Sequence, residues 1–298
     1  MISARRSRIL LSFGTTLASC VALTGISSVA YAVDAELFRL PGRDSAQPLA
    51  SRLSTHDQTE LLIALDELGA SAESDQNSRA VADLLRAGQP DVVTDHALDA
   101  LSRMKSREAR AVLAAFCRHR RADARVRAYT ALANLRDSRD FPTIQIIIEG
   151  LRDSAAPVRS QAAVLLGQLQ AKEAVPDLLR ALELGVHTAA AAIGKLGDAA
   201  SVQSYGKQLG RLPLPVMLEG YAQYLERPAI DIAESVKLEI IASLEQVSGA
   251  TVKAFLNARV QTPGKNTTPK LQQAMLTSAG RIRVEDPTPN TGAQEQQP

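Results

Sequence analysis

The sequence has 298 residues, of which 45% are hydrophobic, 22% are charged and only 3% are aromatic. Its 48 alanines and 38 leucines, with no tryptophan, favour closely packed helices over a large β-sandwich or barrel, which draw on β-branched and aromatic residues. This apolar content also excludes disorder throughout the chain. The net charge of +2 depends on three arginines in residues 1–32, which contain no acid; the rest is nearly neutral and gives no reason to expect nucleic acid.

Residues 1–32 have the three parts of a secretory signal peptide. Three arginines lie within the first eight residues, an apolar run begins at Ile9, and Ala30-Tyr31-Ala32 places small residues before a cleavage point at Val33. Serine, threonine and glycine dilute the apolar run, so we expect cleavage rather than a permanent membrane anchor. The sequence therefore predicts an exported protein, in a bacterial periplasm.

The two cysteines leave a second interpretation of the same segment open. Leu17-Ala18-Ser19-Cys20 resembles the bacterial lipobox, in which the cysteine is lipidated and anchors the protein to the envelope. The residues that follow Cys20 stay apolar, which favours soluble export. Removal of Cys20 would leave Cys117 as the single cysteine, without a disulfide partner and on an apolar helix face, where we expect an inert buried thiol.

Composition also sets the limits of the folded part. Residues 33–50 contain Pro41-Gly42 and Pro48 and are interpreted as a segment that leads into the fold. Residues 51–282 are predicted to form the helical part, with a loop at Thr262–Thr268 before the last helix. Residues 283–298 lack an apolar period, are rich in proline and glutamine, and are predicted to be disordered.

Self-similarity is the strongest signal in residues 51–282. Eleven residues separate Val158 from Leu169 along one apolar stripe, and seven more lead to Pro176, at the start of a second apolar run. The same spacing recurs from Val93, and in altered form from Val126, where only nine residues lead to the closing leucine. Each helix pair has an apolar stripe too large to bury alone, so neighbouring pairs must stack. We predict an all-α fold, an α-solenoid of six or seven antiparallel helix pairs.

These motifs resemble a known family of repeats. Val126-Arg127-Ala128, Val158-Arg159 and the later Val175-Pro176 are similar to bacterial HEAT repeats, and more closely to the HEAT-like repeats of phycobilin lyases, over about residues 51–260. The resemblance implies a ladder in which an aspartate of one turn meets the Val-Arg arginine. The residues that match this ladder are Asp123, Arg127, Asp153 and Arg159. Other residues occupy the arginine position in the remaining units, so the ladder is expected to be partial.

One stretch is strongly basic. Eleven lysines and arginines lie between Arg103 and Arg139, against three acids, and in a solenoid the turns of adjacent units line up along one edge. We interpret this stretch either as a solvated edge or as a basic strip that binds an acidic protein partner. The residues assigned to the strip are Arg103, Lys105, Arg107, Arg110, Arg118, Arg120 and Arg121.

Aromatic and histidine residues give weaker indications. Tyr221 and Tyr224 share a helix face and are interpreted either as core or as partner contacts on the concave face of the solenoid. The four histidines have no partner at the spacing of a helical metal site, so we expect no metal. No phosphate-binding loop or nucleophile elbow is present, and we expect no cofactor.

Together these features predict an exported HEAT-repeat scaffold or adaptor that binds a protein partner with an acidic surface and has no catalytic activity of its own. Nucleic acid is not expected as a partner, and membrane contact is expected only through an uncleaved signal or a lipidated Cys20. Two alternatives stay open. One is a lyase-like enzyme or enzyme-assembly factor, and the other is an envelope lipoprotein with a structural role. The sequence predicts no oligomeric state.

Overall fold

The computed structural model describes residues 49–71, 75–104, 106–135 and 139–283. The predicted signal peptide with Cys20, most of the leading segment, Lys105 and nearly all of the predicted tail lie outside these residues. No helix of the described part is long and apolar enough to cross a membrane.

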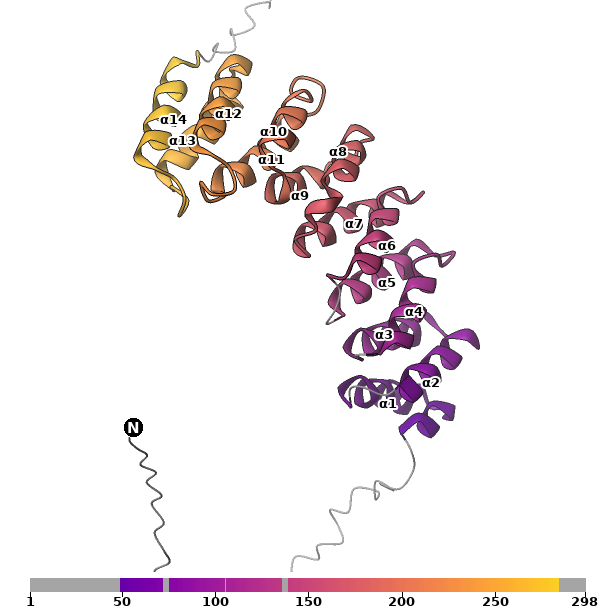
Figure 1. The fold of residues 1–298 in the computed structure, drawn as a ribbon. Helices are drawn as coiled ribbons and strands as arrows, with labels where there is room; N and C mark the ends of the chain where they lie inside the picture. Colours follow the sequence, from indigo (N-terminus) through magenta and orange to yellow (C-terminus); the bar gives the residue numbers. More distant parts are fainter. Residues whose placement is uncertain (1–48, 72–74, 105, 136–138, 284–298) are drawn as a thin grey trace, which may run out of the picture. The chain divides into compact units, whose positions relative to one another are not determined.

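The described residues fold into helices joined by short turns (Figure 1). The described part begins with a 3₁₀ helix, η1 (Leu49–Ser54). A second 3₁₀ helix, η2 (Lys172–Ala174), comes directly before α8. The α-helices of this part are α1 (Gln58–Ala70), α2 (Asp75–Arg86), α3 (Asp91–Arg103), α4 (Arg107–Phe116), α5 (Ala122–Asn134), α6 (Phe141–Gly150), α7 (Ala156–Gln168), α8 (Val175–Glu183), α9 (Ala189–Leu196), α10 (Ala199–Gly206), α11 (Leu214–Glu226), α12 (Glu234–Val247), α13 (Ala250–Gln261) and α14 (Pro269–Arg281).

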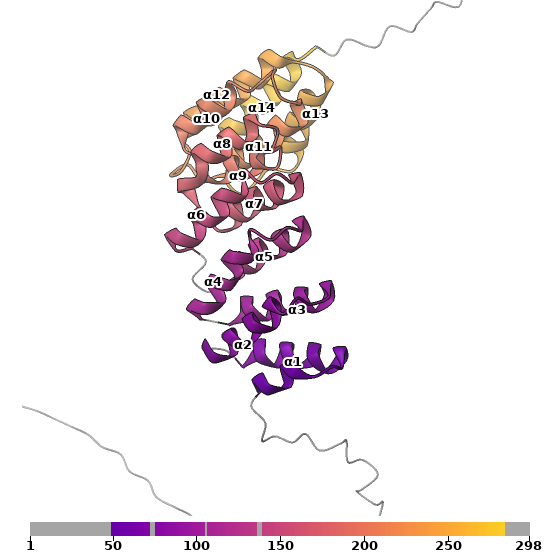
Figure 2. The same ribbon diagram turned by 90° about the vertical axis from the view of Figure 1, so that its right-hand side faces the viewer.

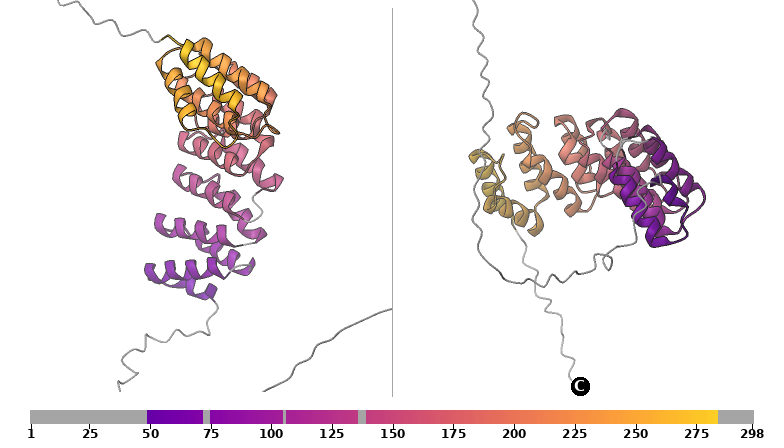
Figure 3. Two further views of the ribbon diagram at one scale, coloured as in Figure 1. Left: turned by 90° about the vertical axis from the view of Figure 1, so that its left-hand side faces the viewer. Right: turned by 90° about the horizontal axis from the view of Figure 1, so that it is seen from below.

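The helices form two layers. The odd-numbered helices from α1 to α11 pack on one another in chain order, and in the other layer α2 packs on α4, while α8, α10, α12 and α14 follow one another (Figure 1). Figure 2 and Figure 3 show the same succession of helix pairs from other sides. The predicted all-α solenoid is confirmed, and the fourteen α-helices of the described part make seven pairs.

Local sequence explains where the helices begin. Aspartate, serine or threonine precedes five of them and accepts a hydrogen bond from a backbone N–H of the first turn, which satisfies a donor that has no partner within the helix. Proline occupies the first turn of five helices, where its missing N–H removes no hydrogen bond. Pro176 is one of these, at the position that the repeat spacing predicts.

Small residues let the odd-numbered helices approach closely. Ala189 and Ala190 of α9 are fully buried. A Cβ atom added to Gly194 would collide with the backbone oxygen of Gly220 on α11, and one added to Gly220 would collide with the hydroxyl of Tyr205. The alanine-rich composition therefore has a structural cause, because larger side chains would force this layer apart.

Candidate functional site

The predicted basic strip is divided by helix α4. Arg103, Arg107 and Arg110 lie at its beginning, and Arg118 and Arg120 lie beyond its other end. Helix α4 has ten residues and is about 15 Å long at about 1.5 Å per residue, with Arg107 and Arg110 in its first turn and Arg118 just beyond its last residue. The prediction of one contiguous strip is therefore wrong, because the helix places its two ends on opposite edges of the layer.

Most arginines of this stretch form ion pairs with the neighbouring repeats. Arg103 binds Asp66 at 2.9 Å, and Arg118 binds Glu149 at 3.2 Å. Further pairs that cross between repeats are Arg110–Asp140 and Arg121–Asp91. Arg107 and Arg120 are exposed and make no ion pair with a described residue. The positive charge of the stretch is thus largely compensated by acids of adjacent units.

The most buried inter-repeat ion pair of the described part joins Arg125 to Asp153. Two nitrogens of the guanidinium donate to the two carboxylate oxygens, both at 2.7 Å, and the side chains are only 11% and 12% exposed. Partial burial alone would raise the pKa of Asp153, but the hydrogen bonds from Arg125 hold this pKa below its ordinary value. Asp153 is therefore a ladder residue, as the resemblance implies, with Arg125 as its partner.

The other ladder assignments need correction. Arg127 binds Asp95 of α3 at 2.8 Å, and Asp123 binds Arg121 of its own turn at 2.8 Å. Arg159 makes no direct ion pair with a described residue. Its guanidinium donates instead to two backbone carbonyls of the preceding turn, at 2.8 and 2.9 Å.

The cause of these errors is the repeat register. Arg125, like Arg159, donates to the carbonyls of the residues six and five positions before it, at 2.8 and 3.2 Å. Ala124, which is fully buried, therefore holds the place of Val158, and the spacing to Leu135 becomes eleven as in the template. Sequence reasoning chose Val126 because it is the larger apolar residue, although Val126 is only half-buried.

The buried Lys237 also binds backbone carbonyls, in a later unit. Its ammonium donates to the carbonyls of Leu225, at 3.0 Å, and Arg227, which end helix α11. Desolvation lowers the pKa of Lys237, and the nearby Arg227 guanidinium adds to this effect. Lys237 lies on α12, and its acceptors are twelve and ten positions before it, so it binds the end of α11 and does not repeat the contacts of Arg125 and Arg159.

The tyrosines are core residues, so the interpretation of Tyr221 and Tyr224 as core is confirmed, and the alternative of rings exposed on the concave face is wrong. Tyr205, Tyr221 and Tyr224 are at most 2% exposed and pack edge to face, with ring centroids 5.1 and 6.0 Å from that of Tyr205. Burial raises the pKa of Tyr221 and of Tyr224 to about 12. Such large rings fill the space between α10 and α11 because the surrounding residues are small.

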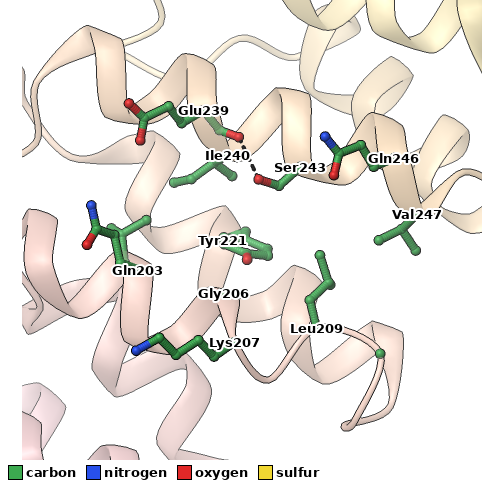
Figure 4. Close-up of a pocket in the computed structure, with 12 residues that line it drawn as sticks. Gln203, Gly206, Lys207, Leu209, Tyr221, Glu239, Ile240, Ser243, Gln246 and Val247 are labelled. Carbon is green, nitrogen blue, oxygen red and sulfur yellow. Dashed lines mark hydrogen bonds between the residues drawn. The ribbon is translucent and has the colours of Figure 1, made fainter.

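A cleft of about 570 Å³ opens between α10 and α12, over the ring of Tyr221 (Figure 4). Gln203 and Lys207 belong to the α10 wall, and Glu239 and Gln246 belong to the α12 wall. Buried apolar side chains of both helices line it more deeply. Sequence reasoning missed this site, although Lys207 and Glu239 are 32 residues apart, which is a repeat spacing and predicts that they face each other.

Cys117 lines a smaller cavity of about 310 Å³ with Tyr129, between α4, α5 and α6. The thiol is 3% exposed, and burial raises its pKa to about 12, so it is protonated at neutral pH. The described residues contain no group of three or more histidine, cysteine, aspartate or glutamate side chains that could hold a metal ion.

Residues 158–183 match the family model of the PBS lyase HEAT-like repeat. This chain contains HEAT-like repeats. The match covers the Val158 unit that served as the template, and it confirms the resemblance drawn from the sequence.

Curated relatives of this chain are named deoxyhypusine hydroxylase. The protein of Aspergillus clavatus is 33% identical over 123 residues, which are 38% of this chain and 35% of the relative. The protein of Oryza sativa subsp. japonica, deoxyhypusine hydroxylase-B, is 31% identical over 161 residues, or 50% and 48% of the two chains. The chain thus spans about a third to a half of the length of these relatives. The prediction of a protein without catalytic activity is wrong, because its curated relatives are enzymes.

Two solved structures are similar at lower identity. The complex of CpcE and CpcF of phycocyanin lyase from Nostoc sp. PCC7120 is 15% identical with a TM-score of 0.40, covering 82% of this chain and 98% of that one. A designed armadillo repeat protein is also 15% identical, with a TM-score of 0.35 over 79% of this chain and 98% of that one.

Proposed function

We propose that this protein works in the enzymatic modification of another protein, as the enzyme itself or as one subunit of the enzyme, with the HEAT-like stack as the binding surface. The observation that carries this proposal is the identity of 31–33% with curated hydroxylases over as much as half of the chain. The name of those relatives denotes the hydroxylation of deoxyhypusine, and the class of reaction proposed for this protein is the modification of a side chain.

The packing of the repeats supports the proposal that the stack serves as a protein-binding surface. Ion pairs such as Arg125–Asp153 and Arg152–Asp177, at 2.7 and 2.8 Å, tie one repeat to the next. Each repeat therefore keeps a fixed position against its neighbours, and contacts with a partner can be spread over several units. The cleft between α10 and α12 interrupts this regular surface with a concave site, the form that ligand sites usually take.

The test captures proteins on the purified full chain and compares the same proteins from cells that have and lack the gene for it. If the protein takes part in the modification, a captured protein is expected to carry a side chain whose mass differs between the two strains. The purified chain is then added to the unmodified protein, alone and with the other captured proteins. Modification by the chain alone indicates a complete enzyme, and modification only with the other proteins indicates one subunit of the enzyme. Identical masses in both strains would contradict the proposal.

Two finer properties belong to the same proposal. An acidic partner surface is supported by Arg107 and Arg120, which stay exposed and without an ion pair to described residues.

Export is supported by the signal-like residues 1–32, and mass spectrometry of the mature N-terminus tests it. A chain that begins at Val33 indicates soluble export, a lipidated Cys20 indicates an envelope anchor, and an intact Met1 in the purified cellular protein would contradict both.

A further inference from the structure

We propose that the cleft between α10 and α12 binds an extended peptide segment of the partner protein, in which an aliphatic side chain lies between an acidic and a basic residue. This inference rests on the proposed function for the existence of a protein partner. It adds the position of the binding site and the chemistry of the segment that occupies it.

The first observation is the hydroxyl of Tyr221 at the back of the cleft (Figure 4). Tyr221 is 2% exposed, and its hydroxyl has no hydrogen-bond partner among the described residues. Its two neighbours are satisfied, because Tyr205 donates to backbone oxygens at 3.0 Å and Tyr224 bonds Ser201 at 2.9 Å. This hydroxyl is not among the fully buried side-chain atoms of the described part that lack a partner, so it reaches the open cleft, where a ligand in the cleft can accept its hydrogen bond in place of water. A peptide carbonyl is such an acceptor.

The second observation is the polar character of the two walls. Four side chains of the walls are exposed, and none forms a side-chain hydrogen bond or ion pair with a described residue: Gln203 of α10, Lys207 directly after α10, and Glu239 and Gln246 of α12. A primary amide offers both a donor and an acceptor, which matches the N–H and C=O groups of an extended backbone. Lys207 and Glu239 present opposite charges, which complement an acidic and a basic residue of one segment.

The third observation is the apolar lining. Val202 and Ile240 are buried beside the cleft, and the less buried Leu209 and Val247 complete the apolar surface. Ligand sites in proteins have volumes of about 300–1,000 Å³ and combine an apolar surface with a few polar groups that fix orientation. Gly206 helps to keep this space free, because a Cβ atom added there would lie 3.5 Å from the Tyr221 hydroxyl. The cleft therefore has room for an aliphatic side chain next to the hydroxyl.

The charges of both signs decide the class of occupant. A nucleic acid or an acidic polymer would be attracted by Lys207 and repelled by Glu239, and a purely apolar helix would leave both charges and both amides without partners. A segment with an acid and a base on either side of an aliphatic residue pairs all of them. A peptide is therefore the ligand that the cleft fits best.

The experiment selects random seven-residue peptides, displayed on phage, for binding to the immobilised full chain. Peptides that also bind Ser243→Trp are removed, because this half-buried residue of α12 lines the cleft and a tryptophan there fills it. Ala242→Trp, an exposed neighbour outside the cleft, is the matched control and keeps binding. The expected result is enrichment of peptides with an aliphatic residue between an acid and a base. Enrichment without this pattern, or no enrichment, overturns the proposal.

Two further variants test the atoms that carry the argument, with the selected peptides as synthetic probes in fluorescence anisotropy. Tyr221→Phe removes one hydrogen bond and is expected to weaken binding about fivefold to tenfold without changing the melting temperature. The double exchange Lys207→Glu with Glu239→Lys is expected to prefer peptides in which the acid and the base have changed places. Unchanged affinity of Tyr221→Phe and unchanged preference of the double exchange would contradict the assigned contacts.

The outcome is separable from that of the proposed function. If the natural partner is captured and modified equally with the Ser243→Trp protein, the cleft inference fails while the enzymatic role stands. If the selected peptides bind in the cleft but no cellular protein changes its mass, the cleft is a peptide site and the enzymatic role fails.

Discussion

The region from α3 to α7 and the region from α10 to α12 use oppositely charged residues at similar spacings and differ in what these residues do. Arg125 and Asp153, 28 residues apart, meet at 2.7 Å in nearly buried positions. Lys207 and Glu239, 32 residues apart, stay exposed on two walls of a cleft. The difference shows that a repeat spacing brings residues to the same edge, while the separation of the helices decides whether they bind each other or a ligand.

The largest expected effect comes from forcing apart the helices that pack most closely. Gly194→Ala places a Cβ atom against the backbone oxygen of Gly220, which cannot move without shifting α11. We expect a loss of about 3 kcal/mol in the free energy of unfolding, measured by urea denaturation. Gly280→Ala in α14 is the control, since a Cβ there meets nothing within 4 Å, and it should stabilise the protein by about 0.5–1 kcal/mol. Equal effects of both substitutions would contradict the close packing.

The ion pair of the first region gives the next effect. Asp153→Ala leaves the nearly buried guanidinium of Arg125 without its carboxylate and should cost about 2–3 kcal/mol in unfolding free energy. Asp177→Ala breaks a pair whose arginine, Arg152, is 63% exposed, and should cost less than about 1 kcal/mol. If the two variants unfold at the same urea concentration, burial does not distinguish these pairs.

Alkaline pH is expected to destabilise the region from α10 to α12, which contains Tyr221 and Tyr224. The pKa values of Tyr221 and Tyr224 are raised to about 12 in the folded protein, against about 10 in an unfolded chain. The stability that their neutral form provides is therefore complete below pH 10 and is lost as the pH rises toward 12, at up to about 2 kcal/mol for each ring. Tyrosinate absorbance and circular dichroism along a pH titration measure both events. Ionisation of these rings near pH 10 in the folded state would contradict their burial.

The smallest effect on stability is expected from the unpaired arginines. Arg107→Glu with Arg120→Glu changes exposed side chains and should alter the unfolding free energy by at most about 0.5 kcal/mol. Capture of an acidic partner should nevertheless weaken, most clearly at low salt. Reversal of Arg121 is the contrast, because this residue binds Asp91 and Asp123 and its loss should also destabilise the stack. Unaltered capture by the first variant at low salt would remove the acidic-partner proposal.

Local patterns predicted the helices better than the contacts between them. Apolar stripes and the first-turn Pro176 identified the helices, since these signals act within a few residues of one another. The repeat register was misassigned at Val126 because apolar size, without burial, did not separate Val126 from Ala124. The sequence leaves both a buried and an exposed position open for Tyr221 and Tyr224, because two residues on the same face of a helix do not reveal whether that face is buried.

The sequence by itself determined an all-helical repeat fold, a deeply buried apolar stripe in each unit and the small residues that allow close packing. These properties follow from periodicity and side-chain size, which are local. Only the tertiary structure decided that Arg125 rather than Arg127 meets Asp153, that the basic stretch divides at α4, and that Lys207 and Glu239 border an open cleft. Ion pairs and clefts depend on distances of a few ångströms between helices, which small changes in packing reset and which no local pattern records.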